Sequence, residues 1–127
     1  MTRVLLVDDD PSVCEVLAAN LEAEGYEVDT VGDGPAGWDR IVETRPDLVV
    51  LDWMLPGRSG IDLLADLRRH PRTKDLPVVL LSAKARDAEI WEGWQAGANY
   101  YLTKPFQIEQ LLYYLELLAA ESTPRPA

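Results

Sequence analysis

Short hydrophobic runs alternate with stretches of helical periodicity along the whole chain. Three of the runs are continuous and rich in branched residues: RVLLV (3–7), DLVVLD (47–52) and VVLL (78–81). Runs of this kind predict strands that are buried on both faces of a sheet. EVDTV (27–31) alternates polar and apolar residues, which predicts an exposed edge strand, and YYLT (100–103) predicts a fifth strand.

Helical patterns fill the segments between these strands. Asp10 followed by Pro11 is typical of a helix start, and Gly25 is typical of a helix end. A second helix opens at residues 33–35, and its inner face is expected to hold Trp38, Ile41 and Val42. Three further helices are predicted around residues 61–68, over 85–96 and over 106–120.

The predicted order of elements is a strand followed by a helix, repeated five times. Strands that alternate with helices form a parallel sheet with helices on both faces. Right-handed connections then favour an α/β fold with a doubly wound five-stranded parallel sheet. The length of 127 residues suits one domain, placed at residues 1–120, and ESTPRPA (121–127) is interpreted as a Pro-rich tail or the start of a linker.

Composition narrows the classes of function. A formal net charge of -10 disfavours direct binding to nucleic acid or to an anionic membrane. Cys14 is the only cysteine, so an internal disulfide is excluded. No apolar run approaches the ~20 residues that span a membrane, and the four apolar residues after Arg3 are too few for a signal peptide. These features predict a cytoplasmic protein.

Charged and polar residues stand at the carboxyl ends of four predicted strands. An acidic run, Asp8-Asp9-Asp10, follows the first strand, and Asp52 ends the third. Ser82 follows the fourth strand, and Lys104 follows the fifth. Because doubly wound sheets bind ligands outside the carboxyl ends of their strands, these groups are expected to converge in one shallow pocket.

The donor types in this pocket indicate a metal and a reaction. Carboxylates gathered without His or Cys favour a hard divalent cation, and Mg²⁺ is the plausible one. A carboxylate beside such a cation and a lysine suits phosphoryl transfer through an acyl phosphate. Asp52 is the expected nucleophile because it stands alone on a central strand, whereas Asp8 and Asp9 sit together like a metal cradle.

Four stretches carry a resemblance to a known family: LLVDDD (5–10), LVVLDWMLPGRSG (48–60), VVLLSAK (78–84) and YLTKPF (101–106). Their order and spacing over residues 2–120 resemble the receiver domain of two-component response regulators. The resemblance implies a flavodoxin-like (βα)5 fold with strand order 2-1-3-4-5. It also implies a phosphorylation-driven switch that catalyses only its own phosphorylation and dephosphorylation, and not an enzyme with a turnover substrate.

The resemblance implies a role for each matching residue. Asp9 would ligate Mg²⁺ directly, Asp8 would help through water, and Met54 would offer its backbone carbonyl. Asp52, also at the metal, would accept the phosphoryl group from a phosphohistidine on a sensor histidine kinase or a phosphotransfer protein.

The same resemblance assigns the residues that read the phosphoryl group. Ser82 and Lys104 would contact its oxygens, and Tyr101 would be the switch aromatic that turns inward when Ser82 moves. The Lys104-Pro105 bond is expected to be cis. Asp10 is expected to cap a helix and not to bind metal.

Two other functions compete with this interpretation. An aspartate-nucleophile phosphatase of the haloacid dehalogenase type would place the nucleophile in the run Asp8-Asp9-Asp10, although its late acidic pair is missing and no cap domain fits. Gly32, Gly34 and Gly37 spell G-x-G-x-x-G, a dinucleotide-binding pattern, but they follow an edge strand and also suit a helix entry.

Aromatic residues depart from the pattern of DNA-binding family members. In the family, the face of the fourth helix, fifth strand and fifth helix is the output surface, and winged-helix members dimerise there through salt bridges. Here Asn99-Tyr100 replaces the usual acids. One of the two helix tryptophans is expected to pack in the core. An aromatic contact, in a homodimer or with another partner, is predicted through Trp91, Trp94, Tyr100, Tyr113 and Tyr114.

Overall fold

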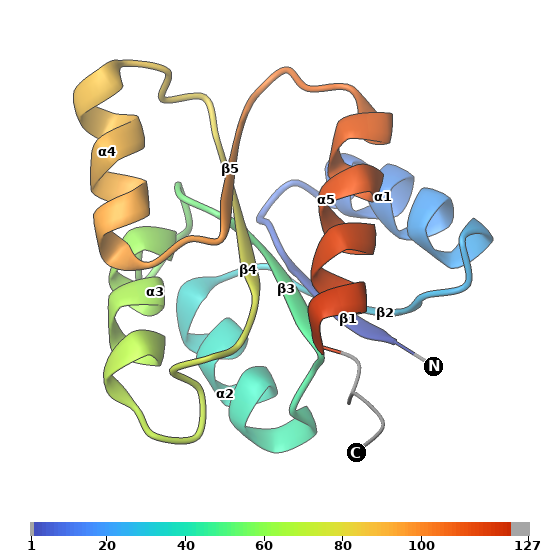
Figure 1. The fold of residues 1–127 in the computed structure, drawn as a ribbon, viewed down its shortest axis with the longest axis horizontal. Helices are drawn as coiled ribbons and strands as arrows, with labels where there is room; N and C mark the ends of the chain where they lie inside the picture. The colour runs from blue at the N-terminus through green and yellow to red at the C-terminus, as the bar shows by residue number, and fades with distance from the viewer. Residues whose placement is uncertain (1, 123–127) are drawn as a thin grey trace.

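A computed structural model of the chain describes residues 2–122, and within them the sheet is parallel with the order β2-β1-β3-β4-β5, as predicted. The strands are β1 (Arg3–Val7), β2 (Glu27–Val31), β3 (Leu48–Asp52), β4 (Val78–Ser82) and β5 (Tyr100–Thr103). The helices are α1 (Pro11–Ala23), α2 (Gly34–Thr44), α3 (Gly60–Arg69), α4 (Asp87–Ala96) and α5 (Ile108–Ser122). Helices α1 and α5 cover one face of the sheet, and α2, α3 and α4 cover the other (Figure 1).

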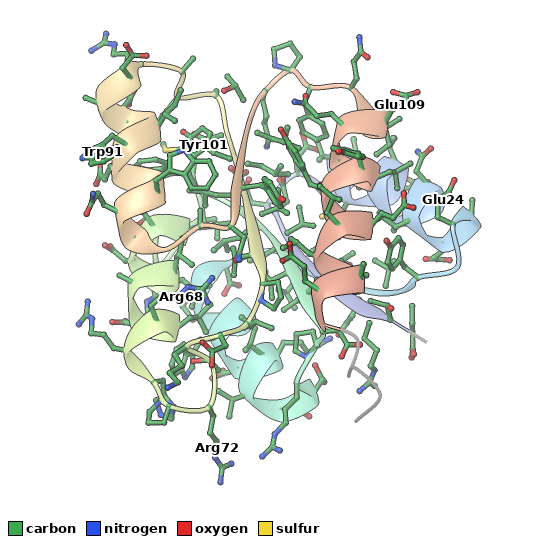
Figure 2. The ribbon with its side chains drawn as sticks, in the orientation of Figure 1. Glu24, Arg68, Arg72, Trp91, Tyr101 and Glu109 are labelled. Atoms are coloured by element: carbon green, nitrogen blue, oxygen red, sulfur yellow. The ribbon has the colours of Figure 1, made fainter. Side chains whose placement is uncertain are left out.

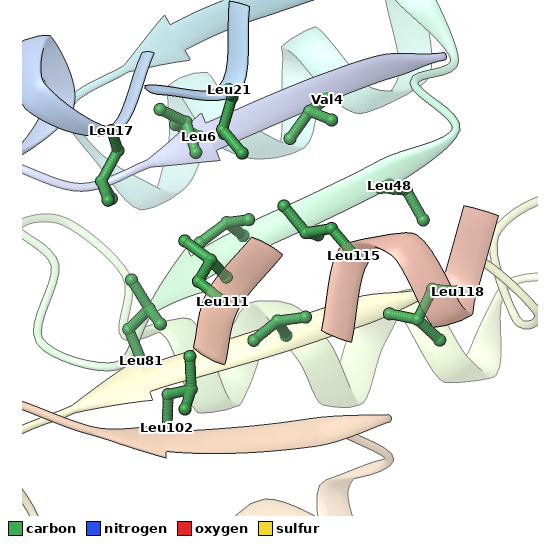
Figure 3. Packing of buried hydrophobic residues seen from close by; sticks show 12 residues of the cluster. Val4, Leu6, Leu17, Leu21, Leu48, Leu81, Leu102, Leu111, Leu115 and Leu118 are labelled. Carbon is green, nitrogen blue, oxygen red and sulfur yellow. The ribbon is translucent and has the colours of Figure 1, made fainter. Parts of the chain in front are cut away.

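Two hydrophobic cores lie on the two faces of the sheet. Successive strand residues point to opposite faces, so Val4 and Leu6 pack under α1 and α5 while Leu5 and Val7 pack under α2 and α3. Figure 3 shows three leucines of α5 lying over the strands: Leu111, Leu115 and Leu118. Every residue of β3 and β4 is buried, which explains their continuous apolar sequences.

Most of the predicted helix ends agree with the structure. The Asp10 carboxylate caps α1 by accepting hydrogen bonds from the backbone N–H groups of Ser12, at 2.9 Å, and Val13, at 3.4 Å. Helix α5 continues to Ser122, so it includes the first two residues of the predicted tail. The rest of that tail lies outside the described residues. No helix within residues 2–122 is both long and apolar enough to cross a membrane.

Two predictions about buried side chains are wrong. Val42 was expected on the inner face of α2 but is 53% exposed, because the buried stripe of this helix runs through Gly37 and Ile41. Trp91 and Trp94 are 64% and 43% exposed, so neither tryptophan packs in the core. Small Gly93 takes the buried position of α4 instead.

Hydrogen bonds from Arg68 link the amino ends of β4 and β5 to α3. Its guanidinium donates hydrogen bonds to the backbone carbonyls of Gly97 (2.9 Å) and Leu76 (2.6 Å), and to the side-chain oxygen of Asn99 (3.0 Å). The same Asn99 oxygen accepts a hydrogen bond from the backbone N–H of Val78 at 2.8 Å. Asn99, which replaces an acid of the family pattern, is therefore a structural residue here.

Replacing Arg68 by Ala is expected to destabilise the fold by about 3 kcal/mol, because partly buried carbonyls lose a charged donor. Urea unfolding followed by circular dichroism measures this loss. Arg69→Ala is the matched control, since the Arg69 side chain is 75% exposed, and it should change stability by less than about 0.5 kcal/mol. Equal unfolding midpoints for the two variants would contradict a stabilising role for the hydrogen bonds of Arg68.

Candidate functional site

The carboxyl ends of β1, β3 and β5 bring Asp8, Asp52 and Lys104 together. The Lys104 ammonium lies 3.1 Å from a carboxylate oxygen of Asp8 and 3.2 Å from one of Asp52. Both carboxylates are almost fully buried, with 4% and 5% of their residues' surfaces exposed. Three residues that are far apart in sequence therefore form one charged cluster, as predicted from the strand ends.

Backbone groups fix the two buried carboxylates. Asp8 accepts a hydrogen bond from the backbone N–H of Asp10 at 3.0 Å, and Asp52 accepts one from that of Met54 at 3.3 Å. The Lys104-Pro105 peptide bond is cis, as predicted. The second oxygen of each carboxylate faces Lys104.

The cluster carries more negative than positive charge. Burial raises the pKa of Asp52 above its ordinary value, and the neighbouring charge of Asp8 raises it further, while Lys104 opposes both effects. Burial alone would lower the pKa of Lys104, but its hydrogen bond to Asp8 and the charges of Asp52 and Asp8 outweigh burial and raise it. Lys104 therefore stays charged between two carboxylates that it cannot fully neutralise.

The remaining negative charge suits a divalent cation. Asp9 is exposed, and one of its carboxylate oxygens lies within 4.8 Å of ligand oxygens of Asp8 and Asp52. Oxygen donors from carboxylates, open on one side to water, match the preferences of Mg²⁺. The residues present fit this ion, and the predicted metal residues Asp8, Asp9 and Asp52 are brought together. Met54 lies in the loop after β3 and is 61% exposed.

Ser82 and Tyr101 lie beside this cluster on β4 and β5. Ser82 is fully buried, and its hydroxyl accepts a hydrogen bond from the backbone N–H of Lys84 at 3.0 Å. The Tyr101 hydroxyl donates a hydrogen bond to the backbone carbonyl of Lys84 at 2.7 Å. Residue Lys84 thus links the two side chains through its backbone. Burial raises the pKa of Tyr101.

The sequence alone did not indicate what surrounds Tyr101. Its ring lies between α4 and the sheet (Figure 2), and its centre is 6.2 Å from that of the buried Trp53 ring, with the two planes at 75°. A Cβ atom on Gly93 would come within 2.7 Å of the Tyr101 ring, so α4 needs glycine there. The Lys84 ammonium lies over the Trp53 ring, 4.7 Å from the ring centre.

The family model described as "Response regulator receiver domain" matches residues 4–116. The chain belongs to this family. This assignment leaves the haloacid dehalogenase alternative without support, and the fold and the gathered Asp8, Asp52 and Lys104 agree with the family.

Individual relatives agree with this assignment. The chain is 39% identical to the phosphate regulon transcriptional regulatory protein PhoB of Rhizobium meliloti over 124 residues, which cover 98% of the chain and 55% of that protein. It therefore spans about half the length of this curated relative. The receiver domain of the Francisella response regulator 1452 superimposes with a TM-score of 0.92 at 32% identity, covering 97% of this chain and 100% of that one.

A second solved structure contains a metal. The receiver domain of the sensor histidine kinase PA1611 from Pseudomonas aeruginosa has a magnesium ion coordinated in its active site cleft. It is 30% identical, has a TM-score of 0.85, and covers 94% of this chain and 98% of that one.

Packing explains two of the three glycines in the G-x-G-x-x-G pattern of this receiver domain. A Cβ atom on Gly34 would lie 2.3 Å from the backbone oxygen of Arg58, and one on Gly37 would lie 3.1 Å from a methyl group of Val7. These glycines let α2 approach the loop after β3 and the sheet. The dinucleotide interpretation is therefore weakened, because close contacts within the protein account for Gly34 and Gly37.

The predicted interface residues of the receiver domain fall into two groups. Tyr100 and Tyr114 stack at 4.2 Å with an angle of 5° between their rings, and Tyr113 lies 6.0 Å from Tyr114. Trp91 lies on the outer side of α4, away from β5 (Figure 2). Trp94, the other tryptophan of α4, is also exposed. The tyrosines form one cluster across β5 and α5, and the tryptophans belong to the surface of α4.

Proposed function

We propose that this receiver domain accepts a phosphoryl group on Asp52 in a Mg²⁺-dependent reaction and thereby controls a partner or an output domain. The observation that carries the proposal is the buried cluster in which the Lys104 ammonium bridges Asp8 and Asp52 at 3.1 Å and 3.2 Å. The phosphoryl donor would be a phosphohistidine on a sensor histidine kinase or a phosphotransfer protein.

The proposed metal ligands are the carboxylates of Asp8, Asp9 and Asp52 and the backbone carbonyl of Met54. Bound Mg²⁺ supplies positive charge to the phosphoryl oxygens. The magnesium ion in the receiver domain of PA1611 supports this assignment by similarity.

The chain's own groups carry the transfer. An oxygen of Asp52 attacks the phosphorus atom, the bond between phosphorus and the histidine nitrogen breaks, and an acyl phosphate forms on Asp52. Lys104 is already within hydrogen-bond distance of Asp52, so its ammonium stabilises the charge that develops on the phosphoryl oxygens.

The signal would leave the site through Ser82 and Tyr101. Ser82 is expected to move its hydroxyl toward the phosphoryl group and to give up the backbone N–H of Lys84. This movement would break the link to the Tyr101 hydroxyl through Lys84, so the ring could turn further inward under Gly93 and alter the surface of α4 and β5.

The experiment that tests the proposal is incubation with Mg²⁺ and acetyl phosphate followed by intact mass measurement. One added phosphoryl group in Mg²⁺ and none in EDTA is the expected result. An unchanged mass in both conditions, with no Mg²⁺ binding by calorimetry, would refute phosphorylation and leave only the receiver fold.

Lys104→Met is expected to slow this phosphorylation by about 100-fold, because a preorganised positive donor is lost. The variant should also be less stable than the parent by about 2 kcal/mol in EDTA, since Asp8 and Asp52 would repel without it. Timed mass spectra and thermal unfolding measure both effects. Lys74→Met, an exposed lysine in the loop after α3, is the control, and equal rates for the two variants would argue against Lys104.

The proposed output contact is a homodimer formed through α4, β5 and α5. The family's salt-bridged contact is not expected, because Asn99 is engaged by Arg68 and tyrosines occupy β5 and α5. The stacked Tyr100 and Tyr114 with the 57% exposed Tyr113 offer an aromatic surface of the kind enriched at interfaces. Trp91 and Trp94 would extend the contact along α4.

Phosphorylated protein is expected to sediment as a dimer, and Tyr113→Ser is expected to weaken its self-association at least tenfold, about 1.4 kcal/mol. Val16→Ser, at a 59% exposed position of α1, is the control. A phosphorylated protein that stays monomeric at all concentrations would refute the homodimer.

Direct binding of nucleic acid by this domain is not expected. The net charge of -10 repels phosphate backbones. The relative PhoB is a transcriptional regulatory protein, and this chain covers 55% of its length. Any contact with DNA in such a protein would then belong to the part that this chain does not cover.

A further inference from the structure

A cavity of about 340 Å³ lies between α2 and the loop after α3. It is far from the phosphorylation site, because it is lined by residues that precede β3 and β4, whereas Asp52 and Ser82 end those strands. The cavity is open to solvent, since Val42, Arg45 and Arg72 of its lining are exposed, and its volume is in the range of small-molecule sites, about 300–1,000 Å³.

The floor and walls of this cavity are mostly apolar. Ile41 and Pro46 are buried at its base, and Leu76 closes one side. Trp38 and His70 form an aromatic wall, with ring centres 5.9 Å apart and planes at 73°. The 53% exposure of Val42 is explained here, because Val42 lines the cavity and not the core. Such a lining suits the flat apolar body of a ligand.

The rim of the cavity is positively charged in a strongly acidic protein. Arg45 and Arg72 line it, and no acidic residue does, although Glu43, Asp47 and Asp75 are close in sequence. Neither arginine forms a hydrogen bond or an ion pair through its side chain with any residue within 2–122. Figure 2 shows Arg72 extending from the loop after α3 into solvent. Both guanidinium groups are therefore available to an anion.

The backbone of Arg45 adds a second observation. It ends α2 in the left-handed conformation, with φ 49° and ψ 66°. Glycine is the usual residue at this position, because a side chain is disfavoured in that conformation. Arg45 is the one residue other than glycine with positive φ among those the structure describes. The chain therefore places an arginine side chain at the rim, at a helix end where the left-handed conformation favours glycine.

We propose that this cavity binds a small planar organic acid, with its apolar body on Trp38, Ile41 and Leu76 and its carboxylate on Arg45 and Arg72. Guanidinium groups bind carboxylates through paired hydrogen bonds, which gives the anion its place at the rim. The inference is independent of the phosphorylation of Asp52, since the two sites lie at opposite edges of the sheet.

Titration of the ¹⁵N-labelled protein in EDTA with 2-naphthoate, and separately with neutral 2-naphthamide, tests the proposal by NMR. A Kd of about 1 mM or tighter is expected for 2-naphthoate. The shifted signals should be the Trp38 indole and the backbone amides of residues 41–45, 70 and 72–76. The amide analogue, which has the same shape without the charge, should bind at least about tenfold more weakly.

Variants distinguish the contribution of the arginine charges to binding from that of the apolar lining of the cavity. The double variant Arg45→Gln with Arg72→Gln should weaken 2-naphthoate at least about tenfold and leave 2-naphthamide unchanged. Both side chains are exposed, so the fold should be kept. Arg86→Gln, another exposed arginine, is the control and should bind like the parent.

Three results would overturn the proposal: no shifts at any accessible concentration, equal affinity for the acid and the amide, or shifts centred on α4 and α5. Asp52→Asn should bind 2-naphthoate like the parent protein, so failure of the proposed phosphorylation leaves this test unaffected.

Discussion

Asp52→Asn is expected to abolish phosphorylation by acetyl phosphate completely, because an amide oxygen cannot form the acyl phosphate. The side chain keeps nearly the same shape, but Lys104 and the backbone N–H of Met54 bind different oxygens of Asp52, so the single amide oxygen keeps only one of these two hydrogen bonds. Intact mass measurement in Mg²⁺ should show no added phosphoryl group over a time in which the parent protein is fully converted.

Asp8→Asn is the matched comparison. It removes a carboxylate that is a proposed metal ligand but leaves Asp52 in place. Phosphorylation should therefore be slower and require a higher Mg²⁺ concentration, but it should not be lost. Phosphorylation that persists in Asp52→Asn and disappears in Asp8→Asn would place the nucleophile after β1 and contradict the assignment.

The same Asp52→Asn substitution is expected to stabilise the protein in EDTA. The pKa of Asp52 in the fold is raised by burial and by the charge of Asp8. A raised carboxyl pKa favours folding at low pH, and this contribution is lost as pH rises through the raised value. Above its raised pKa, the ionised Asp52 therefore costs stability, and the variant lacks this cost.

Differential scanning calorimetry at pH 7 in EDTA should show a midpoint higher by a few degrees for Asp52→Asn. The difference should shrink as the pH falls through the raised pKa of Asp52. Mg²⁺ should stabilise the parent protein more than the variant, because it relieves the repulsion between carboxylates. A lower midpoint for the variant in EDTA would contradict this account of the charged cluster.

Gly60→Ala is expected to destabilise the fold by about 3 kcal/mol or more. A Cβ atom at Gly60 would lie 2.0 Å from the backbone oxygen of Asp52 and 3.0 Å from the Cα atom of Trp53. Both are backbone atoms, so no side-chain rotation relieves the clash. The backbone N–H of Gly60 also donates a hydrogen bond to the carbonyl of Trp53 at 2.8 Å, which holds the start of α3 against the end of β3.

Urea unfolding of Gly60→Ala measures this loss, and phosphorylation should fall as well because the backbone of Asp52 is displaced. Gly32→Ala is the control, since its Cβ would meet only the backbone oxygen of Asp8, at 4.0 Å, and stability should change by less than about 0.5 kcal/mol. Unchanged unfolding of Gly60→Ala would show that α3 can shift away from β3 without cost.

The sequence by itself determined the fold and the residues that gather at the site. Periodicity distinguishes strands from helices, and parallel strands place their carboxyl ends at one edge. The run Asp8-Asp9-Asp10, Asp52, Ser82 and Lys104 could therefore be assigned to one pocket before any contact was known. Asp10 was separated from the metal residues because Pro11 follows it at a helix start.

Only the tertiary structure decided which apolar residues on the helix surfaces are covered by another element and which stay exposed. Sequence periodicity states which side of a helix is apolar, but it does not state how closely the next element approaches. Val42 and Trp94 are apolar residues at positions that no element covers, so both are exposed. Asn99, which replaces an acid in the family pattern, finds its role only when Arg68 reaches it from α3.

The cavity beside Trp38 shows the same limit most clearly. Its lining comes from α2 and from the loop after α3, which are joined by no sequence pattern. Local sequence patterns predict each element, because helix hydrogen bonds lie within a few residues and the side chains of a strand alternate between its two faces. The space between two elements depends on the packing of residues far apart in the chain, and only the tertiary structure determines it.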